Sequence, residues 1–440
     1  MEIVVYIGGA VLFFALVMAS IALHEAGHMF WGKLFGVKTT QFFIGFGRTL
    51  WSFRPTIAGK PSETEYGLKL VPLGGFVRFT GMLPPARTDL PGTIRASSTG
   101  IFSSMAEHAR AAEWEEITPQ DNGRLFYQKK PWQKLVIMAG GPVMNLLIAF
   151  VIFVVLVGSQ GIQQGSLTVQ SVGECVLTAD SGHTTCQAGD PVSPAYAMGI
   201  RAGDKIVSFN GTPIKSWDQL SGLIRDNLDH PATVVVDRNG ARTELPTTNT
   251  VVNGVTSKWD PEKIVKAGFL GVTPTREIVR GGPLLALKVM WNYTERTVYF
   301  LGQFPVRVYD VAANLIGGKP RDVNGPMSIV GASRVAGEVA STSKLVVGEK
   351  VATFASLLGS VNLFVGLFNF VPLLPLDGGH IVGALYEMVR RLLSRVFKLR
   401  HGGYFDIAKL MPLTYLIAGF ILICGVVLVV ADVIDPIRLF

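Results

Sequence analysis

The most prominent pattern in the sequence is the alternation of long apolar stretches with polar segments. Four stretches approach or exceed the roughly 20 apolar residues that a helix needs to cross a bilayer. They cover residues 3–23, 135–157, 351–376 and 412–434. Four crossings place both ends of the chain on the same side of the membrane. The pattern therefore predicts a polytopic α-helical membrane protein with about four transmembrane helices.

The segments between the apolar stretches show other patterns. Residues 32–84 are rich in aromatic and β-branched side chains punctuated by glycine, which predicts a β-hairpin associated with the membrane surface. Residues 163–275 combine short β-like runs with one helical run at 217–228, as expected for a compact α+β domain. A helical stretch at 283–316 fits either the outer membrane surface or packing on that domain.

These patterns divide the chain into segments with predicted boundaries. In chain order they are a first transmembrane helix at 1–31, the β-hairpin region at 32–84, a cytoplasmic loop at 85–131, a second transmembrane helix at 132–158, the α+β domain at 163–275, a juxtamembrane helical region at 276–350, a third transmembrane segment at 351–389, a cytoplasmic loop at 390–411 and a fourth transmembrane helix at 412–435.

Composition and charge support a membrane protein and indicate its orientation. The chain is 49% hydrophobic and only 16% charged, whereas soluble proteins average about 25% charged residues. Lysine and arginine gather at 33–78, 129–134 and 390–400, and the termini carry few charges. By the positive-inside rule these basic loops are cytoplasmic, so the domain at 163–275 is extracytoplasmic. The net charge of +8 follows from this topology and predicts no nucleic-acid partner.

Two of the three cysteines lie in the segment predicted to be outside the cytoplasm. Cys175 and Cys186 are close in the sequence, and disulfides persist in extracytoplasmic compartments. A disulfide between them is therefore predicted, with two unpaired thiols as the alternative. Cys424 lies in the last apolar stretch and is expected to be a small buried apolar residue.

The first apolar stretch ends in the motif HEAGH, formed by His24, Glu25 and His28. Two histidines four residues apart lie on one face of a helix and can bind the same zinc ion. Glu25 can then act as general base on a water molecule activated by that ion. The alternative is a helix end whose side chains satisfy local hydrogen bonds. Because ionisable residues inside a membrane are costly and usually functional, the zinc site is favoured. The stretch lacks a basic n-region and a cleavage site, so we expect it to be retained rather than removed as a signal peptide.

A catalytic zinc site usually has three protein ligands and one open position. The third apolar stretch ends in NFVPLLPLDGGH, which places Asp377 at a comparable depth. The prolines and glycines around Asp377 are expected to break or bend the helix, and such irregular backbone occurs at membrane depth only where protein encloses it or water reaches it. Asp377 is therefore the predicted third ligand. The alternative is that Asp377 is an acid at a helix end that faces cytoplasmic water. His380 could compete as the third ligand, or it could be a polar residue beside the site.

These motifs together resemble the site-2 protease family of intramembrane zinc metalloproteases. The resemblance rests on HEAGH in the first transmembrane helix, TEYGLKLVPLGG after it, and LDGG with Asp377 in a later helix. The extracytoplasmic stretch AGDKIVSFNGTPI resembles part of a PDZ domain. A single PDZ-like domain, the paired cysteines and the terminal DPIRLF are most similar to the actinobacterial members that act in regulated intramembrane proteolysis.

The resemblance implies a zinc endopeptidase of the bacterial cell membrane whose active site faces the cytoplasm. His24, His28 and Asp377 would bind Zn²⁺, and Glu25 would be the general base. The substrates would be single-pass membrane proteins, such as anti-sigma factors, that an upstream site-1-type protease has already trimmed. The extracytoplasmic PDZ-like domain would favour trimmed substrates by binding an extended terminus or excluding bulky ectodomains.

The resemblance also implies residues that bind the substrate or support the core. Asn369 and Pro372 match an N-x-x-P segment that holds the substrate near the metal, and Asn145 in GGPVMN matches a supporting motif of the second helix. Gly74 and Gly75 lie in the predicted hairpin, whose edge can bind an extended substrate by strand addition. A hairpin that only fills space in the protein is the alternative.

The residues alone leave other classes of function open. A non-catalytic, PDZ-containing membrane scaffold with a structural zinc site contains the same motifs. A metal transporter also carries His and Asp inside the membrane, although the chain lacks a second set of polar residues that would form an exit path. A soluble secreted protease fits less well because the HEAGH motif is embedded in a segment of membrane length.

Overall fold

The computed structural model describes residues 2–57, 59–85, 101–115, 117–177, 185–257, 263–398 and 404–438. The chain divides into two compact units. The first unit combines Met1–Leu156 with Pro283–Phe440, and the second unit is Val157–Gly282.

In the part of the chain that the structure describes, four helical spans are long and apolar enough to cross a membrane. They are α1 (Glu2–Leu34), α3 (Pro131–Ser159), α8 (Val347–Asn369), and α10 (Met411–Ile434) together with the short 3₁₀ helix η3 (Ile407–Leu410) that precedes it. The prediction of about four membrane helices is confirmed at this level. The helix α1 continues three residues beyond the predicted end at residue 31, through Leu34.

Glycines allow α1 and α3 to pack with their backbones in contact. A Cβ atom on Gly27 of α1 would lie 2.4 Å from the carbonyl oxygen of Gly140 in α3. Helices in a bilayer associate mainly through van der Waals packing, and small residues make close packing possible. Because no larger side chain fits at Gly27, this contact sets the distance between the HEAGH turn of α1 and the first half of α3.

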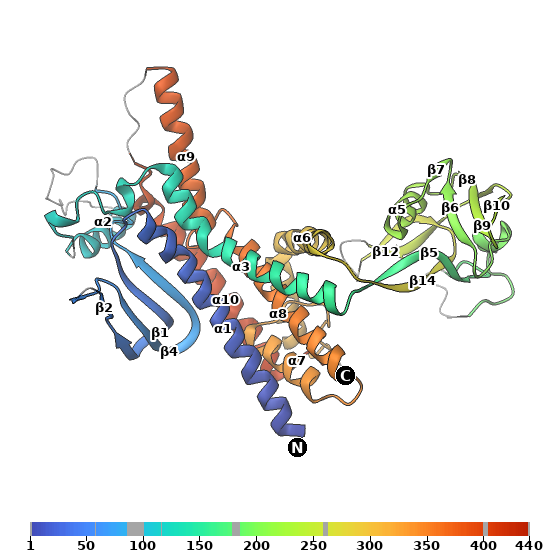
Figure 1. Cartoon of the computed structure of the whole chain (residues 1–440), viewed down its shortest axis with the longest axis horizontal. Coiled ribbons are helices and arrows are strands. Elements are labelled where there is room, and N and C mark those ends of the chain that lie inside the picture. The colour runs from blue at the N-terminus through green and yellow to red at the C-terminus, as the bar shows by residue number, and fades with distance from the viewer. Residues whose placement is uncertain are drawn as a thin grey trace. The chain divides into compact units, whose positions relative to one another are not determined.

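The predicted hairpin is a more elaborate sheet of two long bent strands, β1 (Thr39–Phe53) and β4 (Glu65–Phe79). Residues 41–44 of β1 lie opposite both 65–68 and 75–78 of β4, while 49–53 lie opposite 66–69. The segment 75–79 is therefore an edge, and no other described strand pairs with it. The bends require repeated register shifts, which a simple hairpin pattern does not predict. Figure 1 shows this sheet beside α1. The short strands β2 (Thr56–Ile57) and β3 (Lys60–Pro61) pair with each other.

The segment predicted as a loop at 85–131 contains regular structure. It includes α2 (Ile101–Trp114) and the 3₁₀ helices η1 (Pro119–Asp121) and η2 (Phe126–Gln128), whereas residues 86–100 lie outside the described part. Arg110 of α2 is buried and donates two hydrogen bonds of 2.6 Å to the Asp406 carboxylate. Glu113 accepts hydrogen bonds from the backbone amides of Met82 and Leu83. These tertiary partners stabilise a short polar helix that the sequence pattern alone does not indicate.

The third membrane segment, predicted at 351–389, is broken into two helices. The helix α8 ends at Asn369 and α9 (Asp377–Val396) begins at Asp377, so residues 370–376 are not helical. Prolines in this stretch remove backbone donors and end the helix, as expected from the sequence. The helix α9 continues seven residues into the region predicted as a loop from 390, through Val396. Its large apolar side chains Leu392, Leu393 and Val396 are exposed in this extension.

The helices α6 (Pro283–Ile316) and α7 (Ile329–Ser341) belong to the first unit. The bounds of α6 coincide with the helical stretch expected from the sequence. Its residues Val308 and Val311 pack against Cys424, Leu428 and Ala431 of α10. The sequence pattern indicated the helix but not this contact, since it left open only the membrane surface or the preceding domain.

The second unit is a small α+β domain with its own core. Its main sheet has the order β10 (Ala241–Glu244), β9 (Val234–Arg238), β6 (Lys205–Phe209), β5 (Ile162–Val172) and β14 (Val272–Val279), with β7 (Thr212–Pro213) paired to β6. The other elements are α4 (Pro194–Ala197), α5 (Trp217–Asp226), β8 (Pro231–Ala232), β11 (Thr248–Asn249), β12 (Val251–Thr256) and β13 (Ile264–Phe269). The core includes Ile206, Leu220 and Val236. The predicted boundary at 275 falls inside β14, because this strand pairs with β5 as far as Val279.

Two covalent and ionic contacts stabilise this unit. Cys175 and Cys186 form a disulfide with a Cα–Cα distance of 5.8 Å. The buried Asp204 carboxylate, in the sequence GIRAGD, accepts hydrogen bonds of 2.8 and 2.7 Å from the Arg238 guanidinium and one from the Arg201 amide. The Arg238 guanidinium is the main reason that the pKa of Asp204 is lowered. Asp204 therefore supports the fold of the domain.

Candidate metal centre

The two histidines of HEAGH lie one turn apart on the same buried face of α1. Their Nε2 atoms are 3.2 Å from each other. The Nδ1 atom of His28 lies 2.8 Å from the carbonyl oxygen of Ile137 in α3. Because a carbonyl oxygen only accepts hydrogen bonds, Nδ1 carries the proton and the Nε2 atom is left with a lone pair for a metal. The contact with α3 thus orients one candidate ligand.

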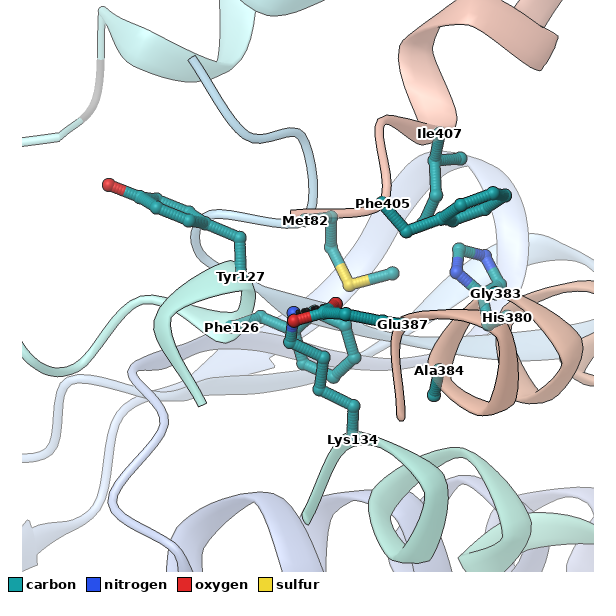
Figure 2. A pocket seen from close by; sticks show the side chains of 10 residues that line it. All are labelled: Met82, Phe126, Tyr127, Lys134, His380, Gly383, Ala384, Glu387, Phe405 and Ile407. Atoms are coloured by element: carbon teal, nitrogen blue, oxygen red, sulfur yellow. Dashed lines mark hydrogen bonds and ion pairs between the residues drawn. The ribbon is translucent and has the colours of Figure 1, made fainter. Parts of the chain in front are cut away.

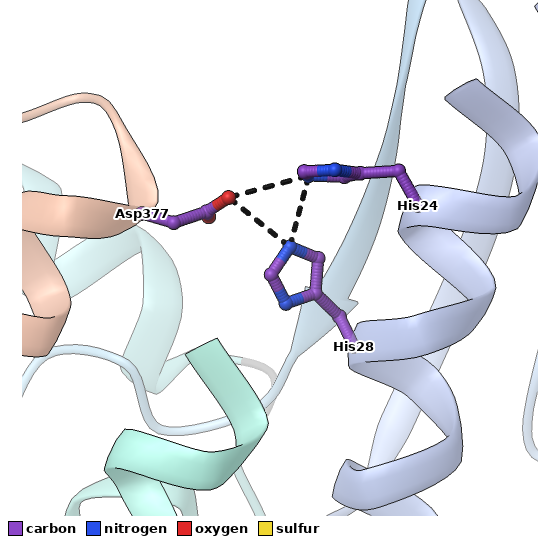
Figure 3. Close-up of side chains that lie close together, drawn as sticks. All are labelled: His24, His28 and Asp377. Atoms are coloured by element: carbon purple, nitrogen blue, oxygen red, sulfur yellow. Dashed lines mark hydrogen bonds and ion pairs between the residues drawn. The ribbon is translucent and has the colours of Figure 1, made fainter. Parts of the chain in front are cut away.

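Asp377 is brought to these histidines from the other end of the chain. It is the first residue of α9, and its Oδ2 atom lies 3.2 Å from His24 Nε2 and 3.3 Å from His28 Nε2 (Figure 3). The three ligand atoms form a nearly equilateral triangle. A tetrahedral zinc ion with bonds of about 2.0–2.1 Å separates its ligand atoms by about 3.3 Å. Two neutral imidazoles and one carboxylate in this arrangement fit zinc in both donor type and spacing.

The helix α3 contributes empty space rather than a ligand. A Cβ atom on Gly141 would lie 2.2 Å from His28 Nε2 and 2.6 Å from His24 Nε2. These distances are close to a zinc–nitrogen bond, so a side chain here would occupy space that a metal or its fourth ligand needs. Gly141 keeps the centre open on the side of α3.

Glu25 follows His24 in α1, and its side chain faces the edge segment of β4. Its Cγ atom is 3.1 Å from the position that a Cβ on Gly75 would take. The side chain is half-buried. A carboxylate next to the two histidines and next to a strand edge is placed to act on a water molecule and on an extended peptide.

The structure places the other predicted site residues as follows. Asn145 is 1% exposed in α3, one turn after Gly141, and its Oδ1 atom has no hydrogen-bond partner among the described residues. Asn369 ends α8 and donates to the carbonyl oxygen of Val365. Pro372 is exposed in the break between α8 and α9. Their contact with a substrate stays a prediction.

The two glycines of the sheet differ in their surroundings. Gly74 has a φ of +125°, which favours glycine, and a Cβ on it would lie 2.6 Å from the Phe46 ring. Gly75 faces Glu25 as described above. Only Gly75 therefore lies beside the metal-binding turn, and Gly74 bends the strand that carries it.

His380, considered as a competing ligand, is not part of the three-residue cluster. It lies one turn after Asp377, and its Nδ1 atom is buried without a hydrogen-bond partner in the described part of the chain. The geometry therefore brings His24, His28 and Asp377 together as candidate ligands, without His380.

Residues 12–410 match peptidase family M50, a range that includes the whole metal centre. The chain belongs to peptidase family M50. It is 31% identical to the zinc metalloprotease Rip1 of Mycobacterium tuberculosis over 99% of each chain. It is 29% identical to Rip1 of Mycolicibacterium smegmatis over 98% of each chain, and 28% identical to the metalloprotease MmpA of Caulobacter vibrioides over 84% of each chain.

This M50 peptidase is thus a site-2-type zinc metalloprotease of the membrane, and Zn²⁺ is its cofactor. The predicted family, enzyme class and cofactor are confirmed. Sequence reasoning missed two features of the centre: the open face at Gly141 and the carbonyl oxygen of Ile137 that orients His28. The glycine pair at 140–141, inside an apolar helix where glycine is unfavourable, was the available signal for the first feature. A backbone carbonyl leaves no signal in a sequence.

Proposed function

We propose that this M50 peptidase hydrolyses single-pass membrane proteins within or near the membrane, on its cytoplasmic side, with His24, His28 and Asp377 as zinc ligands and Glu25 as general base. The observation that carries the proposal is the triangle of ligand atoms at 3.2–3.3 Å, assembled from α1 and α9. Each of these helices belongs to an apolar segment of membrane length or directly follows one.

Zinc in such a site acts as a Lewis acid that polarises a carbonyl and lowers the pKa of water to about 7. The chain supplies the remaining chemistry. Glu25 takes a proton from the hydrolytic water as the oxygen attacks the scissile carbonyl carbon, and it returns that proton to the leaving amine nitrogen as the C–N bond breaks. His28 keeps its orientation through the Ile137 carbonyl during these steps.

A transmembrane substrate must first unwind, because every amide of a helix is already hydrogen-bonded. The freed donors and acceptors need new partners at the site. The edge segment 75–79 of β4 has no partner strand among the described residues on its outer side, and it lies against Glu25. We propose that an extended substrate pairs with this edge, helped by Asn369 and Pro372 in the α8–α9 break and by Asn145 in α3.

The orientation of the protein and the role of the second unit belong to the same proposal. The distribution of Lys and Arg supports a cytoplasmic location of the loops that precede α3 and α10 and an extracytoplasmic location of the second unit. The disulfide between Cys175 and Cys186 suits that compartment. We propose that the second unit is a PDZ-like domain that favours substrates, such as anti-sigma factors, already trimmed by a site-1-type protease.

The test is cleavage of a single-pass model substrate by the full-length protein and by Glu25→Gln, with zinc content measured on both. The variant keeps the size and shape of the side chain but removes the base. We expect it to retain zinc and to lose roughly 10²–10⁴-fold in cleavage rate, the usual contribution of a general base.

Three outcomes contradict the proposal in different ways. Undiminished cleavage by Glu25→Gln removes the proposed base. Normal zinc content in His24→Ala removes the proposed ligand set. Zinc in the wild type without cleavage of any membrane substrate supports a scaffold whose metal is structural.

A further inference from the structure

A buried ion pair joins α3 to the part of α9 that follows Asp377. Lys134 Nζ lies 2.8 Å from Glu387 Oε2, and the two side chains are only 8% and 2% exposed. Arg391, one turn further along α9, donates to the other oxygen of Glu387. The ring of Tyr404 lies 5.3 Å from Lys134 Nζ. Each oxygen of the Glu387 carboxylate is therefore paired with a cationic side chain, buried Lys134 and partly exposed Arg391.

The surroundings of the pair are mostly apolar and leave room for little water. The pair borders a cavity of about 20 Å³, which has room for about one water molecule. The other lining side chains include Met82, Phe126 and Phe405 (Figure 2). Removing two charges from water costs several kcal/mol per ion, and a buried pair often stabilises a protein no more than apolar side chains of the same size. Stability alone is therefore a weak reason for this pair.

The position of the pair offers a stronger reason. On α3, Lys134 precedes Ile137, whose carbonyl orients His28, by one turn, and Gly141 follows after another. On α9, Glu387 lies ten residues after Asp377, about 15 Å along the axis. Asp377 itself follows the non-helical residues 370–376, so no preceding helical turn continues into α9. Close packing of Gly378 and Gly379 on the backbone of residues 370–374 holds the start of α9, and the ion pair adds a second attachment further along the helix.

The metal centre tolerates little movement of α9. Ligand distances in a zinc site are held within about 0.2 Å. A side-chain atom about 6 Å from a helix axis moves by about 0.2 Å when the helix turns by about 2°. Apolar contacts are not directional, whereas the ion pair between Lys134 and Glu387 joins one point on α9 to one point on α3 and so restricts both the height and the rotation of α9.

We propose that Lys134 and Glu387 are positioning residues: their ion pair fixes α9 against α3 and so holds Asp377 at ligand distance from His24 and His28. The inference rests on the ligand set in the proposed function. It concerns the geometry of the centre and assigns neither residue a contact with substrate or metal.

The experiment compares full-length protein with the double variant Lys134→Met/Glu387→Gln, which removes both charges while nearly conserving volume. The measurements are zinc affinity by competition with a chelator, the visible absorption spectrum after cobalt substitution, and the melting temperature. We expect a melting temperature near that of the wild type, a 10–100-fold loss of zinc affinity, and a changed cobalt spectrum, as when groups that orient metal ligands are lost. Lys134→Arg, which keeps the charge, should retain most of the affinity and the spectrum.

The matched control is Arg321→Met/Asp432→Asn. This pair is equally buried, with side chains that are 5% and 1% exposed. It joins α10 to the segment before α7, and neither α10 nor that segment carries a proposed zinc ligand. Its zinc affinity and cobalt spectrum should stay unchanged. If Lys134→Met/Glu387→Gln does not fold, Lys134→Met alone is measured, in which Glu387 keeps the hydrogen bond from Arg391. We expect the same loss of zinc affinity and the same change in the cobalt spectrum, with a lower melting temperature because one partner of a buried pair is missing.

Two results overturn the inference. The first is a double variant at Lys134 and Glu387 with wild-type zinc affinity and cobalt spectrum. The second is an equal loss in the control variant, which would assign the effect to a general weakening of the fold. A wrong assignment of the zinc ligands would be recognised by a separate result. If His24 is not a ligand, His24→Ala should bind zinc like the wild type.

Discussion

Replacing Gly141 by alanine is expected to disable the metal centre without damaging the helix that carries it. The added methyl carbon would lie 2.2 Å from His28 Nε2 and 2.6 Å from His24 Nε2. Non-bonded heavy atoms need about 3.5 Å, so at least one imidazole must move by about 1 Å. That movement is several times the tolerance of about 0.2 Å in a zinc site.

The size of the effect follows from this misfit. We expect zinc affinity to fall at least about 100-fold, which corresponds to about 2.7 kcal/mol. Intrinsic helix propensity changes in the opposite direction, since alanine is favoured over glycine by about 1 kcal/mol in a helix interior. A loss of zinc affinity in Gly141→Ala would therefore result from the methyl group that crowds the imidazoles, and not from a less stable α3.

The assay is chelator competition on purified full-length protein, followed by cleavage of a model transmembrane substrate. Gly8→Ala in α1 is the control, because a Cβ there meets no atom within 4 Å. It should keep both zinc and activity. Wild-type zinc affinity in Gly141→Ala would refute the argument that this face of α3 must stay open.

Three further predictions concern stability. Gly27→Ala should lower the melting temperature, because its Cβ would lie 2.4 Å from a backbone oxygen of α3 and overpacking of this kind costs about 1–3 kcal/mol. Asp204→Asn should destabilise the second unit by roughly 1–3 kcal/mol at neutral pH, through weaker hydrogen bonds with Arg238. Since the pKa of Asp204 is lowered from 3.8 in the folded state, this stabilisation is fully present above pH 3.8 and is lost as the pH falls through the lower folded value, which chemical denaturation at several pH values measures. Replacing Cys175 and Cys186 by serine should cost the second unit about 2–3 kcal/mol, as expected for a closed loop of this length.

Each of these predictions has a matched control. Gly419→Ala in α10, where a Cβ meets nothing within 4 Å, should not lower the melting temperature. Asp226→Asn, at an exposed position of α5, should leave the acid denaturation of the second unit as in the wild type. Reducing agent should destabilise the wild type but not the double serine variant. An unchanged melting temperature in Gly27→Ala would contradict the first prediction. The second would be wrong if the stability of Asp204→Asn depended on pH as in the wild type, and the third if reductant destabilised the double serine variant as much as the wild type.

Several features could be predicted from the sequence because they depend on neighbouring residues. The membrane helices follow from the length of apolar stretches, and the break before Asp377 follows from the prolines that precede it. The convergence of His24 and His28 follows from the helical repeat alone. The helix predicted at 217–228 is α5, Trp217–Asp226, which has a Ser216 cap and an apolar face.

Other features depend on residues that meet only in the folded chain. The polar segment after residue 85 contains α2, whose Arg110 is paired with Asp406, a partner almost three hundred residues away. The two bent strands β1 and β4 form a sheet with several register shifts, which alternation of polar and apolar residues does not encode.

The metal centre shows the same division. By itself the sequence determined a zinc-binding turn in α1, an acid in a broken membrane segment, and the protease family that joins them. Only the tertiary structure decided that Asp377 stands 3.2–3.3 Å from both histidines, that Gly141 faces them, and that Lys134 meets Glu387. Apolar periodicity shows which face of a helix is buried but leaves its rotation and height against another helix undetermined. Those are set to a fraction of an ångström by glycine contacts and buried polar pairs between α1, α3 and α9.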